Sequence, residues 1–153
     1  MIEKNNKKDM VTSMTKRHLN MTVMALGVIL VLSGCAAKTY SLNPTTLTPA
    51  SKGTITGKVD KNENRVLTLK VDYLPIITEL GPELTSYIVW VRRDENEAYM
   101  SQGRMIIDKD RHAELQFMVP YKQMDVLVSA ESDAGAIAPS KLWILQGAVN
   151  LPN

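Results

Sequence analysis

The sequence predicts an all-β domain, an antiparallel β-sandwich of about seven strands over residues 53–149. Apolar and polar residues alternate with a period of two, most clearly over 67–73 and 113–119, as they do in strands with one buried face. Turn-forming residues separate these short runs at regular intervals, and helical periodicity is scarce. Many short strands joined by regular turns are typical of a sandwich.

Turn and breaker residues set the expected limits of each strand. The polar run 60–64 separates the first two strands, and Pro75 ends the second because proline cannot donate to a strand ladder. The run 86–93 is apolar on both faces, so we expect a central strand there, whereas 99–107 is weaker and divides near Gly103. The expected strands are 54–59, 67–73, 86–93, 99–107, 113–119, 125–131 and 140–145.

Residues 1–34 have the composition of a secretory signal peptide. Lys16 and Arg17 precede the apolar run 21–32, and small residues follow it, which matches the charged region, apolar region and cleavage site of such a signal. The run is shorter than the about 20 apolar residues that span a membrane. The polar stretch before Met14 is either a long charged region or an overcalled N-terminal extension.

The apolar run ends in Leu32-Ser33-Gly34-Cys35, which contains the only cysteine of the chain. A leucine, two small residues and a cysteine resemble the lipobox of bacterial lipoproteins. The resemblance implies signal cleavage between Gly34 and Cys35 and acylation of Cys35, which anchors the chain in membrane lipid because two or more acyl chains hold firmly. The alternative is a buried helix in which Cys35 is a small hydrophobic residue. It requires the basic flank, the run length and the small-residue ending to coincide.

The residue after the cysteine bears on location. In the lipoproteins that the motif resembles, an aspartate at this position commonly retains the protein in the inner membrane of Gram-negative bacteria. This chain has Ala36 there. The resemblance therefore implies the outer membrane, with the domain facing the periplasm; in a Gram-positive host the same anchor would hold the domain outside the plasma membrane.

The segment between the cysteine and the first expected strand has the composition of a linker. Residues 36–51 are rich in Thr, Ser, Ala and Pro and lack a sustained apolar period. We therefore expect 35–52 to be the lipidated cysteine followed by a flexible tether. A soft linker of this length has a typical span of about 20 to 24 Å, enough to hold the domain clear of the lipid headgroups.

Charge and motif spacing give no support for nucleic-acid binding, catalysis or a cofactor. Removing residues 1–34, which carry five Lys and Arg and two Asp and Glu, changes the formal net charge from +2 to −1, so the expected domain is not basic. His112 is the one imidazole outside the signal, and no serine lies in a Gly-x-Ser-x-Gly turn. The run 53–59 is one residue short of a phosphate loop and ends in valine, so we expect a strand with small residues.

Two metal hypotheses are not favoured. Asp108, Asp110, His112 and Glu114 alternate, but their spacing lacks the glycine and the fifth-position oxygen ligand of a calcium loop. A blue-copper site needs two histidines and a free cysteine, whereas the expected mature chain has only His112 and an acylated Cys35. We expect a solvated hairpin at 108–114 and no metal site.

Three aromatic residues are candidates for core or contact roles. We expect Trp90 to fill the sandwich core rather than stack on a ligand, because a large aromatic on a central strand packs against both sheets. Tyr121 follows Pro120 and lies where a tyrosine corner could tie a loop to the backbone. Trp143 fits a buried or an exposed position equally well, and an exposed tryptophan would suggest a contact surface.

A set of segments spread over about residues 65–147 resembles a known family. The segments are 67–69 leading to Leu74-Pro75, then 87–91, Gly103 with Asp108, 126–131, Pro139 and 144–147. In this order they are similar to the extracytoplasmic domain of RskA-type anti-sigma-K factors, although the glycine-rich segment before the last strand is represented only by Gly135. The resemblance implies a small immunoglobulin-like β-sandwich. That family also has a transmembrane helix and a cytoplasmic sigma-binding segment. No apolar run of this sequence is long enough to span a membrane and we expect no cytoplasmic domain, so the resemblance does not imply sigma-factor inhibition.

Two function hypotheses follow. In the first, the chain is a membrane-anchored, non-catalytic immunoglobulin-like module that binds an envelope protein or polysaccharide, or contributes to an envelope assembly. In the second, it is a periplasmic sensor or accessory subunit of an envelope signalling system related to the anti-sigma factors. Identification of crosslinked partners in intact cells would separate them.

Overall fold

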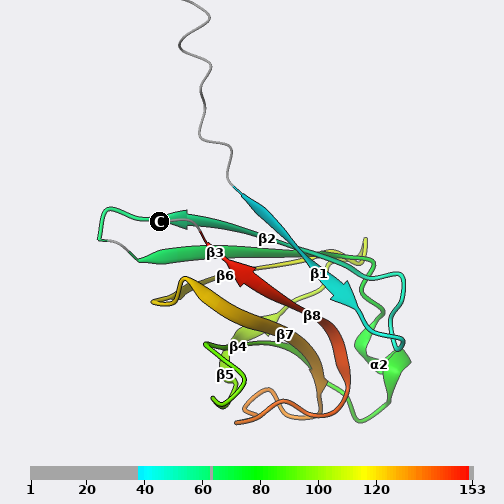
Figure 1. Ribbon diagram of the computed structural model, residues 1–153. Helices are drawn as coiled ribbons and strands as arrows, with labels where there is room; N and C mark the ends of the chain where they lie inside the picture. Colours follow the sequence, from blue (N-terminus) through cyan, green and yellow to red (C-terminus); the bar gives the residue numbers. More distant parts are fainter. Residues whose placement is uncertain (1–37, 63, 152–153) are drawn as a thin grey trace, which may run out of the picture. The chain divides into compact units, whose positions relative to one another are not determined.

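The computed structural model describes residues 38–62 and 64–151, which form an all-β domain (Figure 1). All strand pairs in this part of the chain are antiparallel, so the predicted all-β class and antiparallel pairing are confirmed, with eight strands in place of the expected seven or so. The elements are β1 (Thr39–Pro44), β2 (Lys52–Val59), β3 (Arg65–Asp72), α2 (Ile77–Leu80), β4 (Ser86–Arg92), β5 (Met100–Met105), β6 (Ala113–Val119), β7 (Gln123–Glu131) and β8 (Trp143–Asn150).

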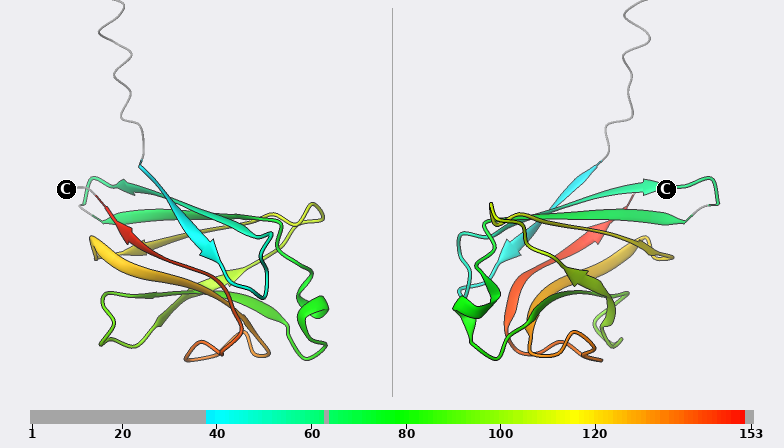
Figure 2. Two further views of the ribbon diagram at one scale, coloured as in Figure 1. Left: turned by 45° about the vertical axis from the view of Figure 1, so that its right-hand side comes forward. Right: turned by 180° about the vertical axis from the view of Figure 1, so that it is seen from behind.

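The eight strands form one nearly closed, barrel-like sheet in the order β5-β4-β7-β8-β1-β2-β3-β6. β1 joins the two halves of this sheet, because residues 39–42 pair with β2 and residues 43–44 pair with β8. On the opposite side a single bridge between Ile107 and Ala113 lies where β5 leads into β6. Figure 2 shows the two halves facing each other around a shared interior.

The strand β1 lies within the segment that was expected to be a flexible tether. Leu42 is only 3% exposed and belongs to the main core, and Thr48 and Ser51 are also buried. The tether expected over 35–52 is therefore wrong from Thr39 onward, and the folded domain begins before residue 53. The prediction failed because β1 carries a single strongly apolar inward position, which leaves no visible alternation in the sequence.

The interior of the barrel is filled by the inward positions of its strands. β3 and β6 follow the predicted alternation, since Leu67, Leu69 and Val71 are buried while Glu114, Gln116 and Met118 on the neighbouring strand are exposed. β4 and β7 are buried on both faces, as expected for central strands. The largest fully buried side chains of this main core are Tyr87, Ile55, Leu67, Leu69, Leu74, Ile144, Leu145, Val71 and Val89.

Trp90 is fully buried, as predicted, but it does not lie in the main core. With Ile88 and Leu127 it forms a second cluster, against which Tyr99 and Ala136 pack. These strand positions alternate with Val89 and Val128 of the main core, so the cluster lies on the outer face of β4 and β7. The loops that contain Tyr99 and Ala136 cover this face.

Two backbone features differ from the expected strand pattern. The region 99–107 contains one strand, β5, rather than two, because a bulge shifts its register against β4 instead of breaking it. Gly103 at this bulge has a φ of +134°, which favours glycine. Tyr73 has a φ of +59° and is 54% exposed, so it leaves the inward series of β3 that the alternation predicted.

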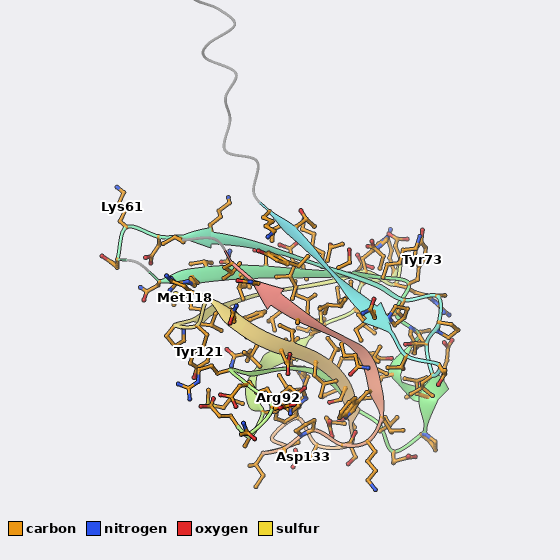
Figure 3. The ribbon with its side chains drawn as sticks, in the orientation of Figure 1. Lys61, Tyr73, Arg92, Met118, Tyr121 and Asp133 are labelled. Carbon is orange, nitrogen blue, oxygen red and sulfur yellow. The ribbon has the colours of Figure 1, made fainter. Side chains whose placement is uncertain are left out.

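The two ends of the barrel carry different residues. β1, β3 and β7 begin, and β2, β6 and β8 end, at the same end of the sheet. Figure 3 shows Lys61, Met118 and Tyr121 toward this end, and Tyr73 at the opposite end near α2. The described chain therefore enters the sheet at this end.

Candidate functional site

Gly34 and Cys35, the expected cleavage and acylation residues, lie outside the residues that the structure describes. The described chain starts at Lys38, and β1 starts at Thr39. No helix in the described ranges is long and apolar enough to cross a membrane. The site that can be built from described residues is a groove on the outer face of the sheet.

The groove has a volume of about 250 Å³ and lies across β7, β8 and β1. The strand register positions its floor, because Asp125 pairs with Ala148 of β8, and Gln146 of β8 pairs with Asn43 of β1. Trp143 stands at the beginning of β8, toward the other end of the groove. The polar and aromatic residues that line the groove are Asn43, Arg92, Tyr99, Asp125, Trp143 and Gln146.

Arg92, at the end of β4, is held by a partner on each side. Its Nε donates to Asp125 Oδ2 at 2.9 Å, and its guanidinium lies 4.7 Å from the centre of the Tyr99 ring, a distance typical of a cation–π contact. Burial raises the pKa of Tyr99, Arg92 lowers it by less, and Asp125 adds to the rise. Tyr99 is neutral at physiological pH, as an unshifted tyrosine also is, and among the residues that line the groove only Arg92 and Asp125 carry charge.

Trp143 presents an aromatic surface whose position is fixed. Trp143 is 37% exposed. Its Nε1 donates to the backbone oxygen of Ser140 at 2.8 Å. Ser140 is itself tied to β7, because its Oγ donates to Ala130 O at 2.9 Å and its backbone N donates to Glu131 Oε1 at 2.8 Å. The indole N–H is thus satisfied within the protein, and the ring contributes apolar contact area.

A buried polar network continues from Glu131 under the covering loop. Ser129 Oγ donates to Glu131 Oε1, and Trp90 Nε1 donates to Ser129 Oγ at 2.7 Å. Ser129 and Glu131 are both buried. Their hydrogen bonds join β4, β7 and the residue Ser140 before β8, so this network holds the loop 132–142 against the outer cluster and positions Trp143.

Two further hollows lie elsewhere on the domain. The larger, about 730 Å³, lies at the end where β1 begins and is lined by Arg93, Asp94, Tyr121 and Lys122, among others. Tyr121 packs partly against the main core. The smaller, about 260 Å³, lies beside α2; there the Tyr87 hydroxyl donates to Pro75 O at 3.1 Å, and burial raises its pKa well above the usual range.

The hairpin expected at 108–114 is organised by its own side chains. Asp108 Oδ1 accepts the backbone N–H groups of Asp110 and His112 at 2.9 and 2.8 Å, which lowers the pKa of Asp108. His112 Nδ1 lies 2.7 Å from Asp72 Oδ1. The Asp108 carboxylate therefore has a role in the turn, and no group of three or more potential metal ligands occurs among the described residues.

The glycine-containing run 53–59 forms β2 as expected. A Cβ on Gly53 would lie 2.9 Å from Leu145 Cδ1, and one on Gly57 would lie 2.5 Å from Leu151 Cδ2. These contacts explain the two glycines by close packing of β2 against β8 and the chain end, which agrees with the prediction of a strand with small residues.

Most groove residues were not singled out from the sequence. Trp143 is the exception, and the structure places it at the surface. Asn43 fell within the expected tether, and Arg92, Asp125 and Gln146 carry no motif spacing. What brings them together is the pairing of β7 with β4 and of β8 with β1, and strand pairing between segments far apart in the chain has no local sequence signal.

Comparison with known proteins does not assign the chain to a family, because no family model, no curated protein and no solved structure matches it.

Proposed function

We propose that the protein is a lipid-anchored envelope lipoprotein, acylated on Cys35 after cleavage of residues 1–34, whose domain is a non-catalytic binding or structural module. The observation that carries this proposal is the position of Leu32-Ser33-Gly34-Cys35, after a basic flank and an apolar run and just before the folded sheet. β1 begins at Thr39, so only three residues would separate an acylated Cys35 from the first strand of the domain.

The short spacer would limit how far the domain can lie from the membrane. Four Cα–Cα steps separate Cys35 from Thr39, which spans at most about 14 Å, less than the span of the expected tether. The end of the barrel where β1 begins would therefore be the end tethered to the lipid. Tyr73 and α2 lie at the opposite end of the barrel, away from this attachment point (Figure 3).

The strand pairings support the proposal that the domain is immunoglobulin-like. In that fold, strands A, B and E pair on one side and strands C, F and G pair on the other. Here β2–β3–β6 and β4–β7–β8 are paired in the same way, with no counterpart of strand D among the described elements. β1 is an additional strand that bridges the two sides.

This pairing also favours the second candidate function, a periplasmic sensor or accessory subunit of a signalling system related to the anti-sigma factors. The anchor is the same in both cases, and only the partner differs. Crosslinking in intact cells, followed by identification of the partners, distinguishes them: a transmembrane regulator supports the signalling role, and envelope polymers or their associated proteins support the binding module.

Acylation is tested with Cys35→Ser and a matched variant, Ser33→Ala, which keeps a small residue in the motif. Cells grown with a labelled fatty acid should incorporate label into the wild type and Ser33→Ala but not into Cys35→Ser, which should remain an uncleaved precursor. If Cys35→Ser still carries the label and migrates like the mature wild type, the proposal is wrong.

The location is tested separately. We propose the outer membrane, periplasmic face, on the basis of Ala36. In a Gram-negative host, sucrose-gradient fractionation should recover the wild type with outer-membrane markers, and Ala36→Asp should move it to the inner-membrane fractions. Recovery of the wild type with inner-membrane markers would contradict the proposed location while leaving the lipid anchor in place.

A further inference from the structure

We propose that the groove across β7, β8 and β1 binds a segment of a neutral glycan. This inference rests on the proposed function, because a lipid anchor would keep the groove next to the polymers of the envelope. Three properties of the groove indicate this class of ligand: a fixed aromatic surface, amide groups without a hydrogen-bond partner, and balanced charge.

The aromatic surface is supplied by Trp143. Its N–H is bonded to Ser140 O, so the indole cannot rotate freely and offers its apolar ring to a ligand. A sugar ring has a face of C–H groups that packs against such a ring. Tryptophan provides large contact area at low cost in side-chain entropy, and that cost is already met here by the hydrogen bonds that hold Ser140 to β7.

The unused amides are those of Asn43 and Gln146, which are paired in register on neighbouring strands. Both residues are exposed, and neither side-chain amide has a hydrogen-bond partner within residues 38–62 and 64–151. Each amide offers both a donor and an acceptor. Neighbouring sugar hydroxyls also donate and accept, so they match this pair better than a purely anionic or cationic group does.

The charge of the groove disfavours strongly charged ligands. Arg92 and Asp125 are paired at 2.9 Å, with side-chain exposures of 26% and 36%, and the neighbouring Tyr99 carries no charge at neutral pH. An anionic ligand would have to compete with Asp125 for Arg92, and a cationic ligand with Arg92 for Asp125. A neutral, hydroxyl-rich ligand can bind without breaking the Arg92–Asp125 pair.

The size of the groove limits how much of a glycan it contacts. Its volume of about 250 Å³ lies below the about 300 to 1,000 Å³ of pockets that enclose a drug-sized ligand. The groove therefore fits a short segment of a longer chain. Weak binding at one such site becomes effective when the protein is held beside a polymer with many equivalent segments.

The test uses the full-length protein, purified in a detergent without a sugar headgroup and titrated with neutral oligosaccharides of N-acetylglucosamine and of glucose. Calorimetry and indole fluorescence should show saturable binding to at least one series. Raising the salt from 50 to 500 mM should leave the affinity unchanged, because salt screens only interactions between charges (the Debye length is about 10 Å at 0.1 M). Trp143→Ala should weaken binding about tenfold, and Trp143→Phe, which keeps a ring, should lose less.

Controls separate a binding defect from misfolding. Asn43→Ala and Gln146→Ala should each weaken binding, whereas Met118→Ala, an exposed truncation on β6, should not. Circular dichroism of each variant should match the wild type. The inference is overturned by absence of saturable binding to both series, by unchanged affinity in Trp143→Ala, or by a protein partner whose crosslinking depends on Trp143. Acylation of Cys35, measured on the same preparation, shows whether the proposed function fails as well.

Discussion

Trp90 Nε1 donates to Ser129 Oγ at 2.7 Å across the β4–β7 pair, where both side chains are fully buried. Removing the acceptor would leave the indole N–H without a partner inside the protein. We expect Ser129→Ala to lower the free energy of unfolding by about 1 to 3 kcal/mol, measured by urea denaturation. Trp90→Ala removes the centre of the outer cluster and should cost about 3 to 5 kcal/mol.

Ser41→Ala provides the matched control, because Ser41 is an exposed serine on a strand of the same sheet. It should change the free energy of unfolding by only a few tenths of a kcal/mol, within the usual range for surface substitutions. Equal stabilities of Ser129→Ala and Ser41→Ala would show that the buried network contributes no stability.

The second prediction concerns Gly103, whose φ of +134° is rarely adopted by a residue with a side chain. A Cβ at this position would lie 3.6 Å from Leu115 Cδ1, so space is not the obstacle and the cost is backbone strain. We expect Gly103→Ala to destabilise the domain by about 1 to 3 kcal/mol, seen as a fall of several degrees in Tm. Gly135→Ala, in an exposed loop, should leave Tm nearly unchanged; similar losses in both would argue against strain at the bulge.

The alternation of apolar and polar residues was sufficient to predict the class of the fold and most of its strands. β3 and β6 stand out because each has several strongly apolar inward positions beside charged or polar outward ones. The closure of the sheet was not predictable, since it depends on β1 pairing with β2 and with β8, which lies about a hundred residues further along the chain. Such a pairing is selected by the assembled core and not by local propensity.

The face of β4 on which Trp90 lies could not be predicted from the sequence either. A strand that is apolar on both faces indicates burial but does not say which face meets the main interior. Here Val89 and Val91 face the interior, and Trp90 faces the outer cluster. The cover over that cluster comes from the loops around Tyr99 and Ala136, whose sequences have no apolar period that would reveal their packing.

The third prediction concerns alkaline pH and Tyr87, which is 1% exposed and whose pKa is raised by burial. In the unfolded chain its pKa is about 10. Below pH 10 both states keep the proton; above it the unfolded state loses the proton first, so stability falls as pH rises toward the folded pKa. We expect a loss of about 1 kcal/mol per pH unit from this residue, measured by urea denaturation between pH 9 and pH 11.

Tyr87→Phe should remove this part of the slope, so its stability relative to the wild type should improve as pH rises above 10. At pH 8 the variant should be less stable, because it lacks the hydrogen bond to Pro75 O. Tyr73→Phe, at an exposed position, should keep the wild-type slope. Parallel pH profiles for the wild type and Tyr87→Phe would mean that burial of this hydroxyl does not affect stability.

The last prediction tests where the domain begins, with two leucines from the segment expected to be a tether. Leu42 is 3% exposed and packs in the main core, whereas Leu47 is 43% exposed. A flexible tether would make both Leu42→Ala and Leu47→Ala neutral. Because β1 completes the sheet, we expect Leu42→Ala to cost about 2 to 5 kcal/mol and Leu47→Ala only a few tenths, measured by urea denaturation. If Leu42→Ala is as stable as the wild type, β1 is not part of the stable fold, and the short spacer proposed between an acylated Cys35 and the domain must be abandoned with it.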